Sequence, residues 1–159
     1  MIYKVIFLKD LFLNIFFSKN YSLFYVVENA NWVTDCEWKS ISNVLNGKGF
    51  IKSRVTSTHL GLRNKIIHFG SVNTFVGEKG IKRVHKSNQI ILTWFHVVGG
   101  DKRLRFITEI NERVSFIHTA CDITKNKLIK ANLEREKIIK IPLGIDLGVF
   151  IPTGNTEKA

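Results

Sequence analysis

The chain has 159 residues, of which 45% are hydrophobic and 23% are charged, and its formal net charge at pH 7 is +11. This length fits about one domain with a single core, and the composition is that of an ordinary globular protein. Two prolines, eleven glycines and no sequence repeat exclude collagen-like, solenoid and low-complexity proteins. Because Cys36 and Cys121 belong to no ligand motif, we expect reduced thiols in a cytoplasmic protein.

The excess of basic residues predicts an anionic partner. The sequence has 24 Lys and Arg against 13 Asp and Glu, spread along the whole chain. Such a charge favours nucleotide phosphates, acidic glycans, anionic lipid headgroups or nucleic acid. No zinc finger, recognition helix or aromatic RNA-binding stretch accompanies the basic residues, so we do not expect a nucleic acid among the partners.

Residues 1–20 form a separate apolar segment. Four polar residues interrupt it: Lys4, Lys9, Asp10 and Asn14. They leave no span of about 20 apolar residues, and no small-residue cleavage site follows, so neither a transmembrane helix nor a secretory signal is expected. Two interpretations stay open. The segment is either a helix packed on the domain, or it lies in the membrane interface with Phe12, Phe16 and Phe17 inserted among the lipids.

From residue 21 onward, short apolar runs alternate with amphipathic stretches. The runs that read as strands are 22–28, 50–58, 65–71, 89–97, 114–119 and 137–143. Helical spacing of apolar residues predicts helices from the cap region 31–35 to Gly47, over 101–113 and over 122–131, and a basic connection is expected over 72–88. This alternation predicts right-handed βαβ units, and therefore an α/β, Rossmann-like fold with a mainly parallel sheet and flanking helices.

Polar residues of ligand-binding type fall at the carboxyl ends of the predicted strands, where open α/β sheets bind ligands. The candidates are Glu28, Asn29, His59, His68, Ser71, His96, His118 and Thr119, with Asp101 at the start of the following helix. Four of the five histidines are therefore expected at one edge of the sheet, lining a cleft; the alternative for each is a half-buried structural role. No pair has a metal-ligand spacing, so no metal is expected.

Motifs of several enzyme classes are missing. The sequence has no GxxxxGK[ST] loop, no GxGxxG after the first strand and no GxSxG elbow, which argues against P-loop, dinucleotide-binding and hydrolase functions. A receiver-type regulator needs an acidic pair after its first strand, whereas Glu28 stands alone.

The C-terminal part of the chain carries a recognisable pattern. His-Thr-Ala-Cys occupies 118–121, Pro-Leu-Gly-Ile-Asp occupies 142–146, and Phe150 and Pro152 follow. This pattern resembles the end of the N-terminal, Rossmann-like domain of family 4 glycosyltransferases, which have the two-domain GT-B architecture. Its Pro-x-Gly-x-Asp spacing followed by Phe-x-Pro is the most specific part.

Further upstream, Ile-His-Phe-Gly-Ser at 67–71 and Thr-Trp-Phe-His at 93–96 are similar to strand ends of the same family, and so is the stretch 25–32. The resemblance covers about 21–152. It implies transfer of a sugar from a nucleotide-activated donor to a glycan or lipid-linked acceptor, with retention of configuration and without a metal or other cofactor. The acceptor-side domain would span 21–152.

The resemblance also implies roles for single residues. His96 would face the interdomain cleft near the transferring sugar, as the candidate catalytic residue. His118 and Thr119 would line the same cleft, and Gly144 and Asp146 would lie at the domain junction.

Two departures from the family pattern matter. Glu-Asn-Ala-Asn at 28–31 stands where many relatives have a Gly-Gly pair, so no direct donor contact is expected from this loop. Asn132 stands where many end the penultimate helix with glycine, so we expect it to adopt the left-handed conformation.

The acidic E-x7-E signature of the family's donor-binding domain is not in the sequence, so residues 153–159 would begin a linker to that domain. We expect the chain alone to be inactive. The alternative is a non-catalytic, acceptor-binding or partner subunit of a split transferase with the same fold. The expected location is the cytoplasm, at the inner face of the membrane if the N-terminal segment binds lipid.

Overall fold

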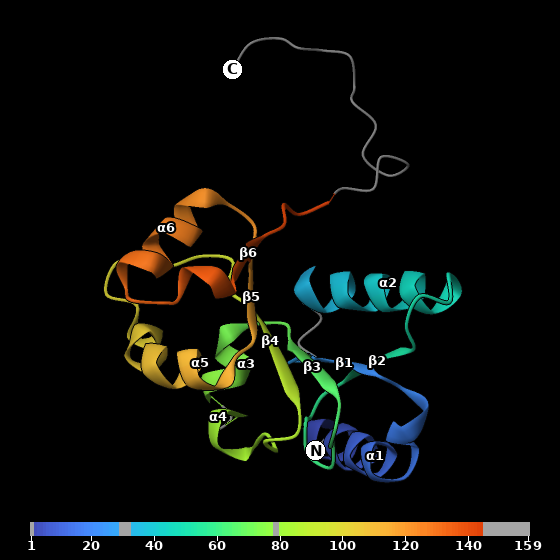
Figure 1. Cartoon of the computed structure of the whole chain (residues 1–159). Coiled ribbons are helices and arrows are strands. Elements are labelled where there is room, and N and C mark those ends of the chain that lie inside the picture. The colour runs from blue at the N-terminus through green and yellow to red at the C-terminus, as the bar shows by residue number, and fades with distance from the viewer. Residues whose placement is uncertain (1, 29–32, 78–79, 145–159) are drawn as a thin grey trace, which may run out of the picture.

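The computed structural model describes residues 2–28, 33–77 and 80–144 (Figure 1). Its centre is a six-stranded, all-parallel sheet with the strand order β2-β1-β3-β4-β5-β6. The strands are β1 (Leu23–Val26), β2 (Ser53–Thr56), β3 (Ile66–Phe69), β4 (Gln89–Thr93), β5 (Phe116–Thr119) and β6 (Ile138–Lys140). Each lies within its predicted apolar run and is shorter than it, and the predicted α/β, Rossmann-like fold is confirmed.

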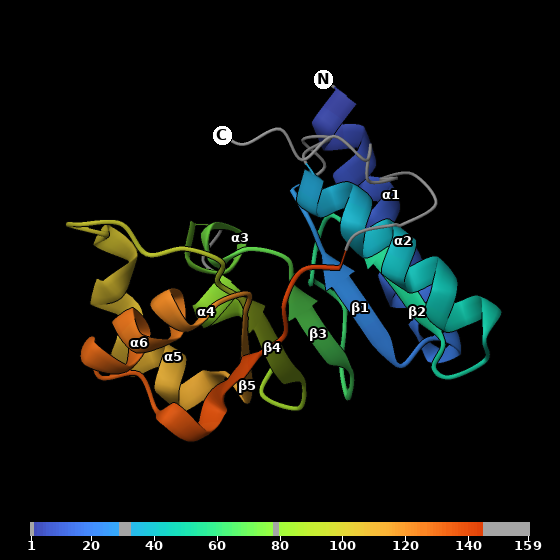
Figure 2. The same cartoon turned by 90° about the horizontal axis from the view of Figure 1, so that it is seen from above.

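The helices divide unequally between the two faces of the sheet. They are α1 (Ile2–Phe17), α2 (Val33–Gly47), α3 (Val72–Gly77), α4 (Gly80–Arg83), α5 (Ile107–Arg113) and α6 (Asp122–Lys130). Among these, α2 alone lies on one face, beside β1 and β2, and the others lie on the opposite face (Figures 1 and 2). The sequence predicted only a basic connection where α3 and α4 form, and the helix predicted from Asp101 begins with a 3-10 turn, Lys102–Phe106.

Side chains alternate between the two faces along each strand. Phe24 and Val26 of β1 point into the larger core, together with Ile67, Phe69, Ile90, Leu92 and Ile117 of the neighbouring strands. Tyr25 of β1 and Val27, which directly follows it, point to the other face and pack against Trp38 of α2. Because α2 lies beside β1 and β2, it does not cover β5 and β6. On this face, Phe116 of β5 and Ile139 of β6 therefore remain 39% and 42% exposed.

The end of α6 confirms the prediction for Asn132. Its φ is 67°, in the left-handed region that asparagine tolerates. The Leu133 amide donates to the Leu128 carbonyl (3.1 Å), and the Asn132 amide donates to the Ile129 carbonyl (3.0 Å). This pair of bonds is a Schellman motif, which satisfies carbonyls that the helix end would otherwise leave unpaired.

The N-terminal helix is attached to the domain by polar side chains. Asp10 accepts hydrogen bonds from the Ser57 amide (2.7 Å) and hydroxyl (2.7 Å), and it pairs with Arg54 at 3.0 Å. Asn14 is fully buried, and its Nδ2 donates to the carbonyls of Thr58 (2.8 Å) and Leu60 (3.2 Å). The connection between β2 and β3 therefore holds α1 in place.

A glycine in that connection lets α1 approach closely. Gly61 has a φ of +82°, and a Cβ built there would lie 2.9 Å from Cγ1 of Ile15. Gly49 has a similar φ of +67°, but a Cβ there would meet nothing within 4 Å. The two positions thus share the backbone conformation and differ in the contact with α1.

We therefore predict different costs for alanine at these two glycines. Gly49→Ala should lower the free energy of unfolding by about 1–2 kcal/mol, the cost of a left-handed alanine. Gly61→Ala should lower it by roughly 1–3 kcal/mol more, because the new methyl group displaces Ile15. Urea denaturation of both variants measures the difference. Equal losses would mean that α1 does not pack on Gly61 as described.

Candidate functional site

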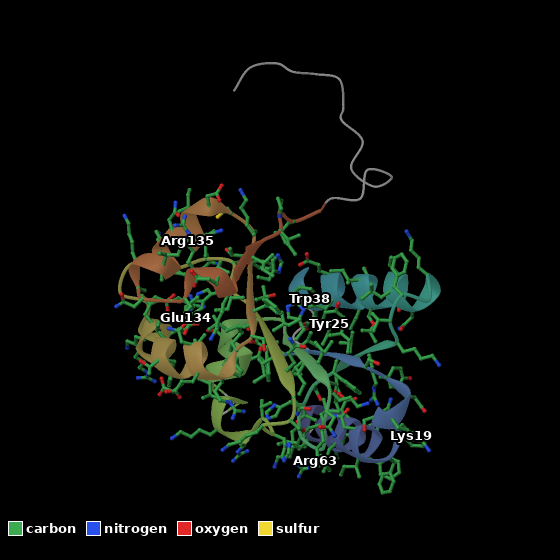
Figure 3. The ribbon with its side chains drawn as sticks, in the orientation of Figure 1. Lys19, Tyr25, Trp38, Arg63, Glu134 and Arg135 are labelled. Carbon is green, nitrogen blue, oxygen red and sulfur yellow. The ribbon has the colours of Figure 1, made fainter. Side chains whose placement is uncertain are left out.

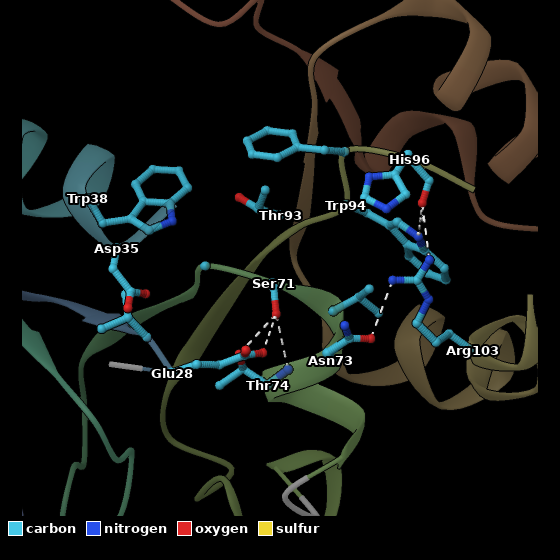
Figure 4. Close-up of a pocket in the computed structure, with 14 residues that line it drawn as sticks. Glu28, Asp35, Trp38, Ser71, Asn73, Thr74, Thr93, Trp94, His96 and Arg103 are labelled. Carbon is cyan, nitrogen blue, oxygen red and sulfur yellow. Dashed lines mark hydrogen bonds between the residues drawn. The ribbon is translucent and has the colours of Figure 1, made fainter. Parts of the chain in front are cut away.

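A pocket lies beyond the carboxyl ends of β1, β3 and β4 (Figure 4). From β1 the chain first adds β2 on one side and then crosses to β3 on the other, so the strand order reverses between β1 and β3. Open α/β sheets bind their ligands in the crevice at such a switch point. The pocket here has a volume of about 180 Å³, and we call it the switch-point pocket.

One wall of the switch-point pocket is a carboxylate held by hydroxyl groups. Oε1 of Glu28, just after β1, accepts hydrogen bonds from the hydroxyls of Ser71 and Thr74, both at 3.0 Å. Ser71 also accepts a hydrogen bond from the Thr74 amide at 3.2 Å, at the start of α3. Since two hydroxyls fix the carboxylate, it is a pre-oriented acceptor for a ligand hydroxyl or amine.

The opposite wall is an arginine whose charge is already compensated. Nε and Nη2 of Arg103 donate to the two carboxylate oxygens of Asp101, at 2.7 and 2.6 Å. Nη1 reaches the Asn73 side chain at 3.3 Å, and the guanidinium lies 5.6 Å from the ring centre of Trp94. The hydrogen bond from Arg103 lowers the pKa of Asp101, which keeps the pair ionic. This wall is rigid and nearly neutral.

His96 lies at the rim between these walls. β4 ends at Thr93, earlier than predicted, because the chain turns so that the indole of Trp94 donates to the His96 carbonyl at 3.1 Å. Arg103 donates to the same carbonyl at 3.2 Å. The imidazole of His96 is exposed and makes no hydrogen bond to the residues that the structure describes. Its backbone is fixed while its ring is available to a ligand (Figure 4).

Trp38 of α2 closes the pocket on the third side. Its side chain is 3% exposed, and its indole N–H has no partner within the described parts of the chain. A Cβ at Gly70 would lie 2.6 Å from that nitrogen, so only glycine permits this approach. The sequence did not indicate Trp38 or Arg103 as pocket residues. Gly70, directly after β3, was the one signal available for Trp38.

A second hollow, of about 430 Å³, lies on the other side of Trp38. It follows the face of the sheet that α2 leaves uncovered, and we call it the sheet-face groove. Its walls are mostly apolar and include Tyr25, Phe116, Ile139 and Ile141. Tyr25 stacks on Trp38 with ring centres 5.2 Å apart (Figure 3), and burial raises the pKa of the tyrosine to about 12.

Two histidines and a threonine form a hydrogen-bonded row along the sheet-face groove. Nε2 of His118 lies 2.9 Å from the Ile141 carbonyl, so it must donate, and Nδ1 is left to accept from Thr93 at 3.3 Å. Nε2 of His68 then donates to the Thr93 oxygen at 2.8 Å. Burial first, and the neighbouring His118 second, lower the pKa of His68 to about 3. His68 is therefore neutral near pH 7.

The structure corrects the prediction of one histidine-lined cleft. His68 and His118 lie on the sheet face and line the groove, because each precedes the last residue of its strand and side chains alternate between faces. His59 packs against Phe69, with ring centres 5.6 Å apart, and is buried on the opposite face. Of the four histidines expected there, His96 alone lines the switch-point pocket.

The other candidate site residues lie in different parts of the structure. Glu28 and Ser71 line the switch-point pocket, and Asp101 acts through Arg103. Thr119 is fully buried with its hydroxyl unpaired among the described residues, and Gly144 lines the sheet-face groove. Asn29 and Asp146 lie outside the described residues.

Two kinds of feature are absent from the described residues. No group of three or more His, Cys, Asp or Glu side chains there is arranged to hold a metal ion. In the same part of the chain, no helix combines the length and the apolar character needed to cross a membrane.

The low pKa of His68 predicts a pH-dependent stability. The unfolded chain, with a histidine pKa near 6.5, binds a proton that the folded state rejects down to about pH 3, so acidification below about pH 6.5 favours unfolding. His68→Gln keeps a donor for Thr93 and removes the titration. The slope of the unfolding free energy between about pH 4 and 6 should fall by up to roughly 1.4 kcal/mol per pH unit.

The measurement is urea denaturation at several pH values. His85→Gln, at an exposed site, is the control substitution. An unchanged slope in His68→Gln would show that His68 is not the buried neutral group described.

Comparison with protein-family models, with curated proteins and with solved structures found no match for this chain. A Rossmann-like fold by itself hosts many unrelated activities, so the geometry and chemistry of the switch-point pocket carry the information about function.

Proposed function

We propose that the chain is the acceptor-side half of a glycosyltransferase of GT-B architecture, and that its switch-point pocket binds the sugar acceptor. The observation that carries this proposal is the pocket itself. It lies at the ligand-binding edge of a parallel sheet and combines a fixed carboxylate, hydroxyl groups and aromatic rings. Such walls match a ligand that offers hydroxyl groups around an apolar ring face.

The charge of the pocket favours a neutral sugar over a phosphate. Glu28 and Asp35 both line it, and the positive charge of Arg103 is compensated by Asp101. Among the lining residues that the structure describes, the cation Arg103 is already paired, so Glu28 would repel a phosphate, whereas a sugar hydroxyl donates readily to Glu28. The net charge of +11 therefore does not describe this pocket.

The size of the pocket supports a half-site. A volume of about 180 Å³ is below the roughly 300–1,000 Å³ of complete small-molecule sites. One sugar ring is the scale of ligand that it suits, and a nucleotide-activated sugar is much larger. In the proposed enzyme the donor is held by a second unit that faces this edge, as the resemblance to family 4 glycosyltransferases implies.

The proposed roles follow from the contacts. Glu28 accepts a hydrogen bond from an acceptor hydroxyl, and the hydroxyls of Ser71 and Thr74 hold it in place. His96 positions the reacting groups from the rim. Retaining transfer in this architecture depends on positioning and on stabilising the leaving phosphate, and that stabilisation is assigned to the second unit.

The sheet-face groove favours the alternative of a partner subunit. Parallel sheets are almost always covered on both faces, but Phe116 and Ile139 are left exposed by the helices that the structure describes. A second polypeptide packed there would make the chain an acceptor-binding subunit of a split transferase. The two-domain enzyme and the split transferase would use the same acceptor site.

The acceptor site is tested by sugar binding to the chain. We expect saturation-transfer NMR with a panel of monosaccharides and short glycans to find a ligand, and Glu28→Ala to weaken its binding by about tenfold or more, the value of one charge-assisted hydrogen bond. Glu134→Ala, at an exposed site (Figure 3), should leave binding unchanged. Tight binding of a free nucleotide that is insensitive to Glu28 would contradict the acceptor assignment.

The role of His96 is tested by turnover in an assay that includes the donor-binding unit. His96→Ala should lower turnover by roughly two to four orders of magnitude with little change in the melting temperature, because its imidazole makes no hydrogen bond to the described residues. His85→Ala should change turnover far less. If the two variants behave alike, His96 does not position the substrate.

A further inference from the structure

The N-terminal helix α1 turns two polar side chains, Asp10 and Asn14, toward the domain and exposes several large apolar side chains to the solvent. Asp10 and Asn14 face inward, where they bind Arg54, Ser57 and the connection between β2 and β3. A surface helix ordinarily shows the opposite pattern, with the apolar stripe buried and the polar face in water. The inversion means that packing on this domain does not explain why the outer residues are apolar.

The outer residues form one continuous face. Val5, Leu8, Phe12, Ile15 and Phe16 are 62%, 62%, 54%, 55% and 59% exposed, and we call them the α1 apolar face. Their spacing of three and four residues puts them on the same side of a helix with 3.6 residues per turn. The rings of Phe12 and Phe16 lie against each other, with centres 4.6 Å apart.

Lysines border the α1 apolar face on both sides. At 3.6 residues per turn, Lys4 lies along one edge of the face and Lys9 along the other, and both are exposed. Lys19 directly follows the helix, and Arg63 follows the glycine that contacts Ile15; Figure 3 shows both beside α1. The one acidic residue of the helix, Asp10, is turned inward and paired with Arg54.

We propose that the α1 apolar face docks onto an anionic lipid bilayer, with the helix lying in the plane of the interface. An apolar stripe with phenylalanines, bordered by lysines, is the pattern of interfacial helices, in which the rings enter the acyl boundary and the lysines reach the headgroups. The helix has 16 residues, about 24 Å at 1.5 Å per residue, which is shorter than a bilayer core of about 30 Å.

Charge favours a lipid surface over a second copy of the chain as the occupant. Two copies meeting at this face would bring Lys4, Lys9, Lys19 and Arg63 of each against the same cations of the other, in a protein of net charge +11. Anionic headgroups supply the opposite charge. This inference rests on α1 and its surroundings and is independent of the sugar site.

The experiment is co-sedimentation of the full chain with vesicles of phosphatidylcholine containing about one-third phosphatidylglycerol. We expect Phe12→Ser/Phe16→Ser to lower the partition coefficient by roughly tenfold or more, because both rings leave the interface. Ile15→Ser and Ile123→Ser form a matched pair, since both isoleucines are exposed on helices, at 55% and 70%, and the second lies on α6. Ile15→Ser should weaken binding and Ile123→Ser should not.

The electrostatic part is tested with the same vesicles. Lys4→Gln/Lys9→Gln, vesicles of pure phosphatidylcholine, and high salt should each reduce the bound fraction several-fold, because each weakens the attraction between lysines and headgroups. Lys4 and Lys9 are exposed and make no contact with the described residues that the fold depends on, so the circular-dichroism melt of Lys4→Gln/Lys9→Gln should match the wild type.

Failure of the wild type to bind anionic vesicles would overturn the proposal, and so would equal losses in Ile15→Ser and Ile123→Ser. A dimer in light scattering that Phe12→Ser/Phe16→Ser abolishes would also overturn it, by showing that a second copy covers the face.

Discussion

The parallel pairing of β1 with both β2 and β3 is the constraint on which the rest of this structure depends. It places β1 inside the sheet, between two neighbouring strands, so both of its faces must be covered, and its residues are apolar on both faces. It also reverses the strand order beside β1, which leaves a crevice at the carboxyl edge. Glu28 lies at that crevice because it follows the last residue of β1 by two positions. Trp38 reaches the same crevice because it lies on α2, which is the next helix along the chain after β1.

The switch-point pocket and the rest of the surface have different electrostatic characters. The chain as a whole is strongly basic, yet the pocket contains Glu28, Asp35 and an arginine that Asp101 already neutralises. Basic residues gather instead at places such as the border of α1, where Lys4 and Lys9 are exposed. Overall charge therefore indicates which large surfaces the protein approaches, and the local pairing of charges indicates what the pocket accepts.

The sequence predicted the sheet well because buried parallel strands are continuous apolar runs, which are visible without a structure. The left-handed Asn132 was predicted from the resemblance to family 4 glycosyltransferases, because many members of that family have glycine at this helix end and asparagine tolerates the same conformation. The sequence did not show that His96 lies apart from His68 and His118. A shift of one position along a strand moves a side chain to the other face, and this places His68 and His118 on the sheet face. The path of the chain after β4 depends on a contact between Trp94 and His96, which the sequence does not reveal. Arg103 and Trp38 reach the pocket through tertiary packing, which no local pattern records.

Trp38 is a single wall between two hollows, since it lines the switch-point pocket on one side and the sheet-face groove on the other. Its ring is held between Tyr25 and Gly70, with no space to shift on the glycine side. Whatever displaces the ring from one hollow must change the shape of the other. A ligand or partner that moved the ring would therefore couple occupancy of the pocket to coverage of the sheet face, and the coupling would be equal in both directions.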